Sequence, residues 1–329
     1  MQVLDEVYGQ FEISDPVLIE LLNSPSIGRL KGIRQYGLPP NYSLLKSFTR
    51  YEHSVGTMLL LRILGASLAE QVAGLLHDVS HTAFSHITEF VFHRDRPTQD
   101  ERHMWFVLSS ELPAILLRYG LEPKLIADLP HHTLLEQPSP SLCADRIDYT
   151  LHEYALDTYN GTLNLLLRNL ETRDGRIVFR TPHAAEIFGM MYLDYNINRW
   201  GSAEQIIRQH LLAKAIRIGL DDGTISLDDL FDVDDLVLQK LTHTKNPAIR
   251  ATLDLLSKDF ELEFDEKNPE MSVPCGFQYV DPEVLFRKKV RKLSSINSYF
   301  AQTLAEKKQY RRQLNVRIHP KSTILKVAN

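Results

Sequence analysis

The sequence predicts a mainly α-helical protein that ends in a small region of mixed helix and strand. Two observations carry this prediction. Apolar residues recur at helical spacing through most of the first 257 positions, and the character of the chain changes from about residue 258. The 329 residues are 43% hydrophobic and 24% charged, as in ordinary globular proteins. No stretch approaches the ~18 uninterrupted apolar residues of a membrane span.

Helical spacing is clearest where Leu68, Val72, Leu75 and Leu76 follow the i, i+4, i+7, i+8 pattern of a buried stripe. The same periodicity predicts helices over residues 105–119, 142–156, 184–218 and 227–241. The polar segment 41–49 follows two prolines and is predicted to be a loop. Residues 172–181 (TRDGRIVFRT) alternate polar and apolar side chains around an Asp-Gly pair, which predicts a small hairpin.

The later part of the chain begins with a turn at residues 221–223, after which Ser226 and Asp229 fit the N-terminus of a helix. Segment 258–274 is acidic and contains two prolines. We expect strands over 277–280 and 314–318, with a basic run at 287–292 and a helix over 295–312 between them. The predicted division is a helical domain at 1–257 and a small α+β region at 258–329.

Composition restricts the class of protein further. The net charge of −5 argues against non-specific binding of nucleic acid through the whole protein surface. The start of the chain, MQVLDEVYGQFEIS, carries acids early and lacks the apolar core of a secretory signal. Cys143 and Cys275, the two cysteines, are too few for a disulfide framework. We therefore expect a cytoplasmic protein without a membrane span.

The strongest chemical signal is the adjacent pair His77-Asp78 at the end of an apolar helix, together with His53 before it and Asp145 after it. Two imidazoles and two carboxylates suit one divalent transition metal (Mn, Fe, Co, Ni or Zn) better than calcium, with Mg as a further option. Taken singly, His77 and Asp78 would equally serve as helix caps and His53 as a buried polar residue.

Four ordered motifs resemble the HD phosphohydrolase superfamily and, within it, the dNTP triphosphohydrolase branch of bacterial dGTP triphosphohydrolases and SAM-and-HD-domain dNTPases. Together they extend the resemblance over about residues 5–215. The motifs are RLKGIRQYG at 29–37, RYEHSVG at 50–56, HDVSHTAFSH at 77–86 and DRIDY at 145–149. In the third motif Ser80 stands for the family's glycine and Ala83 for its proline.

The resemblance implies a helical HD-domain bundle and specific roles for the matching residues. It implies metal ligation by His53, His77, Asp78 and Asp145. It implies catalytic roles at the phosphate for His81 and His86, supported by Glu89, and phosphate contacts from Arg50 and Arg146. It implies substrate contacts from Gln35, Tyr149 and Glu153, with Arg199 at the outer phosphates. Relatives form dimers to hexamers, so the resemblance also implies a homo-oligomer.

Two departures from the family pattern affect the substrate. The family's later histidine is replaced by Gln99, or His103 takes its place from a shifted loop. The family's outer-phosphate clamp corresponds to residues 192–205 (YLDYNINRWGSAEQ), where Arg199 is the one cation and Asp194 and Glu204 are acidic. The clamp for a triphosphate is therefore weakened.

The leading hypothesis is a metal-dependent phosphohydrolase acting on a nucleotide-like phosphate ester. One alternative is a di-iron HD oxygenase, in which His103 and either His131 or His132 would bind a second metal. The other alternative is a non-catalytic HD sensor or scaffold that keeps the metal.

Overall fold

The computed structural model describes residues 1–92, 98–157, 161–309 and 313–324, and most of these residues are helical. The α-helices are α1 Pro16–Leu22, α2 Pro25–Arg29, α3 Arg50–Ile63, α4 Leu68–Leu76, α5 Ile87–Phe92, α6 Thr98–Ser109, α7 Leu112–Arg118, α8 Pro123–Ala127, α9 Ala144–Asp157, α10 Thr162–Asn169, α11 Pro182–Asn198, α12 Ala203–Asp221, α13 Asp234–His243, α14 Pro247–Leu256 and α15 Ser298–Lys307. The strands are β1 Gln2–Asp5, β2 Gly9–Glu12, β3 Leu170–Arg173, β4 Arg176–Phe179, β5 Lys258–Phe264, β6 Met271–Pro274, β7 Glu283–Phe286, β8 Lys289–Lys292 and β9 Gln313–Ile324. The mainly α prediction is confirmed, as is the hairpin expected over 172–181, which is β3–β4.

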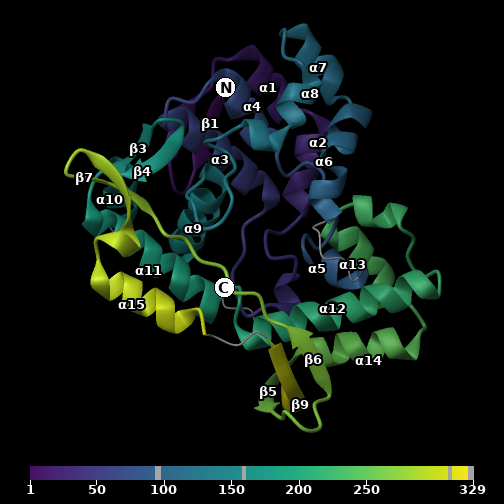
Figure 1. Cartoon of the computed structure of the whole chain (residues 1–329). Helices are drawn as coiled ribbons and strands as arrows, with labels where there is room; N and C mark the ends of the chain where they lie inside the picture. Colours follow the sequence, from purple (N-terminus) through teal and green to yellow (C-terminus); the bar gives the residue numbers. More distant parts are fainter. Residues whose placement is uncertain (93–97, 158–160, 310–312, 325–329) are drawn as a thin grey trace.

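Helix α3 contacts both α4 and α9 (Figure 1). Helix α3 begins at a capping box, because the Thr49 hydroxyl accepts a hydrogen bond from the Glu52 amide and the Glu52 carboxylate accepts one from the Thr49 amide. Ser67 caps α4 in the same way through the Glu70 amide. The packing of these three helices brings together segments that lie far apart in the sequence.

The helix expected over 184–218 is interrupted, so that part of the prediction is wrong. Helix α11 ends at Asn198 and α12 begins at Ala203, capped by Ser202. A Cβ atom at Gly201 would lie 1.9 Å from the Asn196 carbonyl oxygen. Only glycine therefore lets the backbone at residue 201 pass this close to Asn196. The stretch 227–241 is also divided, into a 3₁₀ turn at Asp228–Phe231 and helix α13, and the expected Ser226–Asp229 pair caps the turn.

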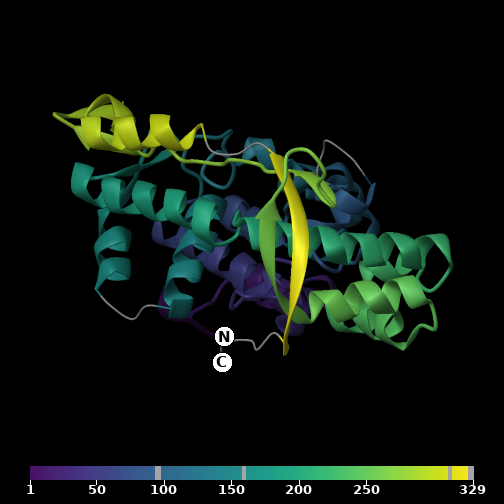
Figure 2. The ribbon, with the colours of Figure 1, turned by 90° about the horizontal axis from the view of Figure 1, so that it is seen from below.

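The strands after residue 257 belong to two sheets. Strand β9 lies between β5 and β6, beside α12 and α14 in the view of Figure 2, while β7 and β8 extend the β3–β4 hairpin into a four-stranded sheet. Strand β7 runs parallel to β4 with Val284 opposite Phe179. The strand expected at 277–280 is wrong, because there the Gln278 amide donates to the Asn196 side chain rather than to a strand neighbour.

Two buried apolar clusters form the core, and each contains residues from before and after position 257. In one cluster Phe300 of α15 packs at Gly189 of α11, and in the other Phe260 of β5 lies beneath the Arg208 guanidinium. The domain division at 257 stays a prediction. Among the described residues no helix has the length and apolar character needed to cross a membrane. Cys143 and Cys275 are both buried and unlinked.

Candidate metal centre and its pocket

Four side chains from three segments converge at one point, as the sequence predicts. His53 comes from α3, His77 and Asp78 follow directly after α4, and Asp145 lies in the first turn of α9. His53 Nε2 lies 3.2 Å from His77 Nε2 and 2.9 Å from Asp145 Oδ1. His77 Nε2 lies 3.6 Å from both Asp78 Oδ1 and Asp145 Oδ1. His53 Nε2 lies 3.7 Å from Asp78 Oδ2.

The outer ring nitrogens of both histidines already have partners. His53 Nδ1 donates to Asp148 Oδ2 at 2.7 Å, and His77 Nδ1 donates to the Gly74 carbonyl at 2.7 Å. The Nε2 atoms of both rings therefore face the two carboxylates, and a bound metal would take the place of their protons. Burial alone would lower the pKa of His77, but Asp78 and Asp145 outweigh it and raise that pKa to about 10. The cluster therefore strongly attracts a cation.

The donor set fits a divalent transition metal. Ligands about 2.1 Å from such an ion are separated from one another by about 3.0–3.4 Å in octahedral or tetrahedral geometry. The distances of 2.9 and 3.2 Å from His53 Nε2 are close to that separation, and those of 3.6–3.7 Å to the carboxylates are slightly longer. The donor atoms of His53, His77 and Asp78 all lie within 4.8 Å of one another. Two neutral imidazoles and two carboxylates also leave coordination positions open for water and substrate.

Arg50 is built into this centre. Its guanidinium donates to Asp78 Oδ2 at 2.8 Å, to Ser85 Oγ at 3.1 Å and to the Gln35 carbonyl at 3.3 Å. The side chain is only 3% exposed. Burial would raise the pKa of Asp78, but Arg50 and His77 hold it well below its usual range. Asp78 is therefore ionised and oriented before any metal binds.

His81 and His86 meet beside the metal donors, where their rings stand edge to face with centroids 4.9 Å apart. The turn between them places Phe84 and Ser85 at φ values of 64° and 49°, in the left-handed region that non-glycine residues seldom occupy. This strained turn is held by the Phe84 amide, which donates to Asp234 at 2.7 Å. Burial, followed by Arg50, holds the pKa of His81 well below its usual range. His86 Nδ1 contacts the Glu89 carboxylate, as expected for a supporting acid.

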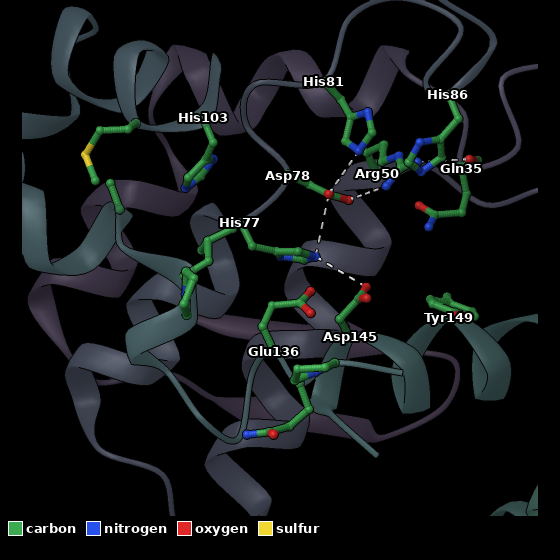
Figure 3. A pocket seen from close by; sticks show the side chains of 16 residues that line it. Gln35, Arg50, His77, Asp78, His81, His86, His103, Glu136, Asp145 and Tyr149 are labelled. Atoms are coloured by element: carbon green, nitrogen blue, oxygen red, sulfur yellow. Dashed lines mark hydrogen bonds and ion pairs between the residues drawn. The ribbon is translucent and has the colours of Figure 1, made fainter. Parts of the chain in front are cut away.

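A pocket of about 750 Å³ opens onto these residues (Figure 3). Gln35 and Tyr149 lie on one side of His77 and Asp145, and His103 lies on the other (Figure 3). The Gln35 Oε1 atom is buried and has no hydrogen-bond partner within the described part of the chain. The polar side chains lining the pocket are Gln35, Arg50, His77, Asp78, His81, His86, His103, Glu136, Gln137, Asp145 and Tyr149. Its apolar wall is formed by Met104, Ala127, Leu129, Pro130 and Pro138.

Three residues expected at the substrate do not line this pocket. The Arg146 guanidinium donates to the Gln137 carbonyl at 2.6 Å and to the Ser141 carbonyl at 3.2 Å. Its hydrogen bonds therefore go to a loop, and its side chain does not line the pocket. The Glu153 carboxylate is fully buried, where it accepts from the Tyr36 hydroxyl and pairs with Arg199. Arg199 also pairs with Asp157.

The acids expected to repel outer phosphates also lie elsewhere. Asp194 accepts from the Asn198 side chain and Glu204 pairs with Arg208, and neither lines the pocket. Whether the site can bind outer phosphates therefore depends on the residues that line the pocket. Among its lining residues Arg50 is the one arginine or lysine.

The histidines proposed for a second metal do not gather. His103 lines the pocket, with Nδ1 3.5 Å from Ser80 Oγ and a buried Nε2 that no described residue meets. His132 Nε2 donates to the Leu125 carbonyl at 3.0 Å, and neither His131 nor His132 lines the pocket. The side chain of Gln99 lies outside the described residues, and His103 lies on helix α6 rather than in a loop.

Sequence reasoning missed Asp148, His152 and Glu136. Asp148 and His152 share a face of α9 with Asp145, at positions i+3 and i+7, and this spacing was a usable signal. Glu136 lies in a loop and lines the pocket, which no local pattern indicates.

Comparisons with known proteins agree with this geometry. A family model described as "HD domain" matches residues 50–151, the segment that contains all four metal donors. The uncharacterized protein YdhJ of Bacillus subtilis is 36% identical over 305 residues, which cover 90% of this chain and 92% of YdhJ. The metal-dependent phosphohydrolase cns2 of Cordyceps militaris is 41% identical over 155 residues, 46% of this chain and 44% of cns2.

More distant relatives extend the pattern. Mouse SAMHD1, a deoxynucleoside triphosphate triphosphohydrolase, is 32% identical over 144 residues, 36% of this chain and 22% of SAMHD1. The match thus spans less than half the length of cns2 and less than a quarter of SAMHD1. A solved phosphohydrolase from Bacteroides thetaiotaomicron shares the fold with a TM-score of 0.70 at 13% identity, covering 98% of this chain and all of that one. The chain belongs to the HD-domain superfamily of metal-dependent phosphohydrolases.

Proposed function

We propose that this enzyme hydrolyses the phosphate ester of a nucleotide and that it handles mono- and diphosphates at least as well as triphosphates. The observation that carries the proposal is the pocket, in which His77 and Asp145 lie between Gln35 and Tyr149 on one side and His103 on the other (Figure 3). A sugar on the first side would meet the unpartnered Gln35 Oε1 and the Tyr149 ring. The resemblance to dNTPases assigns the same two residues to the sugar.

The bound metal would supply Lewis acidity at the phosphate oxygens. Arg50 is already charged and oriented, so it neutralises negative charge that develops at the phosphorus without reorganising. His81 lies 3.3 Å from Asp78 Oδ1 through its Nε2 atom and lines the pocket, where it would orient an attacking water. His86 faces His81 at the pocket and is held by Glu89, which orients it to donate a proton to the leaving oxygen.

The charge of the pocket argues against a preference for triphosphates. A triphosphate brings about four negative charges, which a binding site must match with several cations. Among the lining residues Arg50 is opposed by Asp78, Glu136 and Asp145, and Glu136 is the carboxylate outside the four metal donors. Glu136 would face the tail of a longer substrate, and Arg146, whose charge it interacts with, does not line the pocket.

The test is a steady-state comparison of dNMP, dNDP and dNTP with the Mn²⁺-loaded enzyme. We expect kcat/KM for the monophosphate or diphosphate to equal or exceed that for the triphosphate. Glu136→Gln should raise the dNTP to dNMP ratio by about tenfold, equivalent to about 1.4 kcal/mol of relieved repulsion. A dNTP value far above the other two, with triphosphate released whole, would contradict the proposal. The Asp78→Ala protein, purified in parallel, controls for contaminating phosphatases.

Measurements on the same purified protein distinguish the two alternatives, a di-iron oxygenase and a non-catalytic sensor or scaffold. The di-iron oxygenase needs a second set of histidines, and of His103, His131 and His132 only His103 lines the pocket. Two irons per chain by elemental analysis would nevertheless support it. A sensor would hydrolyse no nucleotide with any metal. We also propose that the protein is a cytoplasmic homo-oligomer. Light scattering measures the mass of the oligomer in solution directly.

A further inference from the structure

Behind the metal donors lies a second, buried layer of polar side chains. Asp148 accepts hydrogen bonds from His53 Nδ1 at 2.7 Å and from the Tyr8 hydroxyl at 2.8 Å. His152, one turn further along α9, has Nδ1 3.1 Å from Asp148 Oδ2 and Nε2 3.4 Å from Asp5 Oδ2. Asp148 is 0% exposed, His152 5% and Asp5 7%. We call these four residues the buried network: Asp5, Tyr8, Asp148 and His152.

Two members of the buried network come from the N-terminal hairpin β1–β2, which lies outside the segment matched by the HD model. Asp5 ends β1, and its Oδ1 accepts from the Val7 amide at 2.8 Å and the Tyr8 amide at 2.9 Å. These bonds hold the turn of the hairpin, which contacts α3 (Figure 1). The hairpin is thereby tied to α9 by polar contacts through Tyr8 and Asp5.

Helix α3 makes room for the buried network at one residue. A Cβ atom at Gly56 would lie 2.3 Å from Asp148 Oδ1 and 2.5 Å from His152 Cε1. Only glycine permits the backbone of α3 to approach these two side chains so closely, and Gly56 is one turn after His53 on the same helix. The packing of α3 on α9 is therefore fitted to the buried network as well as to the metal donors.

We propose that the buried network positions His53 for metal binding, which makes the N-terminal hairpin a working part of the metal centre. A histidine binds a metal through one nitrogen only when the other carries the proton, and an acceptor such as Asp148 fixes both the tautomer and the ring orientation. Asp148 is held in turn by Tyr8 and His152, and His152 by Asp5. Loss of such outer partners typically lowers metal affinity by about 10–100-fold.

The inference rests on the metal site and is independent of the substrate proposed above, so its test uses metal alone. We choose Co²⁺, whose visible absorption reports on the ligand geometry. The informative variants are Tyr8→Phe, which removes one oxygen, and Asp5→Asn, which keeps the side-chain shape and removes the charge. Glu6→Gln is the matched control, because Glu6 is the exposed carboxylate next to Asp5 in the same turn.

We expect Tyr8→Phe and Asp5→Asn to raise the Kd for Co²⁺ by about tenfold, while Glu6→Gln leaves it unchanged. The metal-free Tm of Tyr8→Phe should stay close to the parent value. A purely structural network predicts the opposite pattern, with a lower metal-free Tm and an unchanged Kd. That pattern would overturn the proposal, as would a Kd for Tyr8→Phe equal to that of Glu6→Gln. If Asp5→Asn fails to fold, Tyr8→Phe alone decides the question.

Discussion

Replacing Arg50 by glutamine should weaken the fold and yet strengthen metal binding. In the metal-free protein Arg50 and Asp78 form a buried ion pair with side chains 3% and 4% exposed. His77 remains beside Asp78 in the variant, but after burial Arg50 is the largest influence on that carboxylate, and removing one partner of a buried pair costs about 3–5 kcal/mol. With a metal bound, Asp78 has another cation beside it. The remaining loss is then the two hydrogen bonds to Ser85 and the Gln35 carbonyl, at about 1 kcal/mol each.

The difference between the two states gives the change in metal affinity. A variant destabilised by about 3–5 kcal/mol without metal and about 2 kcal/mol with metal binds that metal more tightly by about 1–3 kcal/mol, because the two quantities are thermodynamically linked. We therefore expect the metal Kd of Arg50→Gln to fall by about 5–140-fold, since 1.4 kcal/mol is tenfold. Hydrolysis should nevertheless decline, because a preorganised positive charge at the phosphate is lost.

Urea unfolding with and without metal, together with a Co²⁺ titration, measures all three quantities. Arg62→Gln is the matched control, since Arg62 lies on the same helix and pairs with Asp15 at 2.6 Å with side chains 28% and 29% exposed. That pair should contribute at most about 1 kcal/mol, equally in both metal states. Weaker metal binding by Arg50→Gln, or a loss of stability that is the same with and without metal, would refute the reasoning.

Three further predictions concern the same centre. Asp78→Ala should abolish both metal retention and hydrolysis, because no other anionic ligand replaces that carboxylate; full turnover by this protein after metal stripping would end the assignment. His81→Ala and His86→Ala should retain the metal but lower kcat by about 10²–10⁴-fold, and parent rates in both would make these histidines structural. In the metal-free protein the pKa of His77 is about 10, above its ordinary value near 6.5. Its stabilising contribution is therefore complete below pH 6.5 and lost as the pH rises through about 10. Unfolding free energies that stay constant over this range without metal would contradict that prediction.

The metal donors and the helices that carry them were predictable because their signals are local. The capping box of Thr49 and Glu52, the apolar stripe of α4 and the adjacent His77-Asp78 pair each depend on residues within a few positions of one another. The order of the motifs along the chain then identified the family. Local patterns therefore determined which residues carry the chemistry.

The tertiary structure decided which partner each polar group meets. Arg146 and Arg199 have the charge that a phosphate site needs, but carbonyls of the 137–141 loop and the carboxylate of Glu153 occupy them. The break at Gly201 depends on how closely the chain returns to Asn196. The link from Asp5 to His53 runs from β1 through His152 and Asp148 of α9 to α3. Such pairings depend on distances between elements far apart in the sequence. Composition and spacing determined which chemical groups this protein has, and packing determined which of those groups line the pocket.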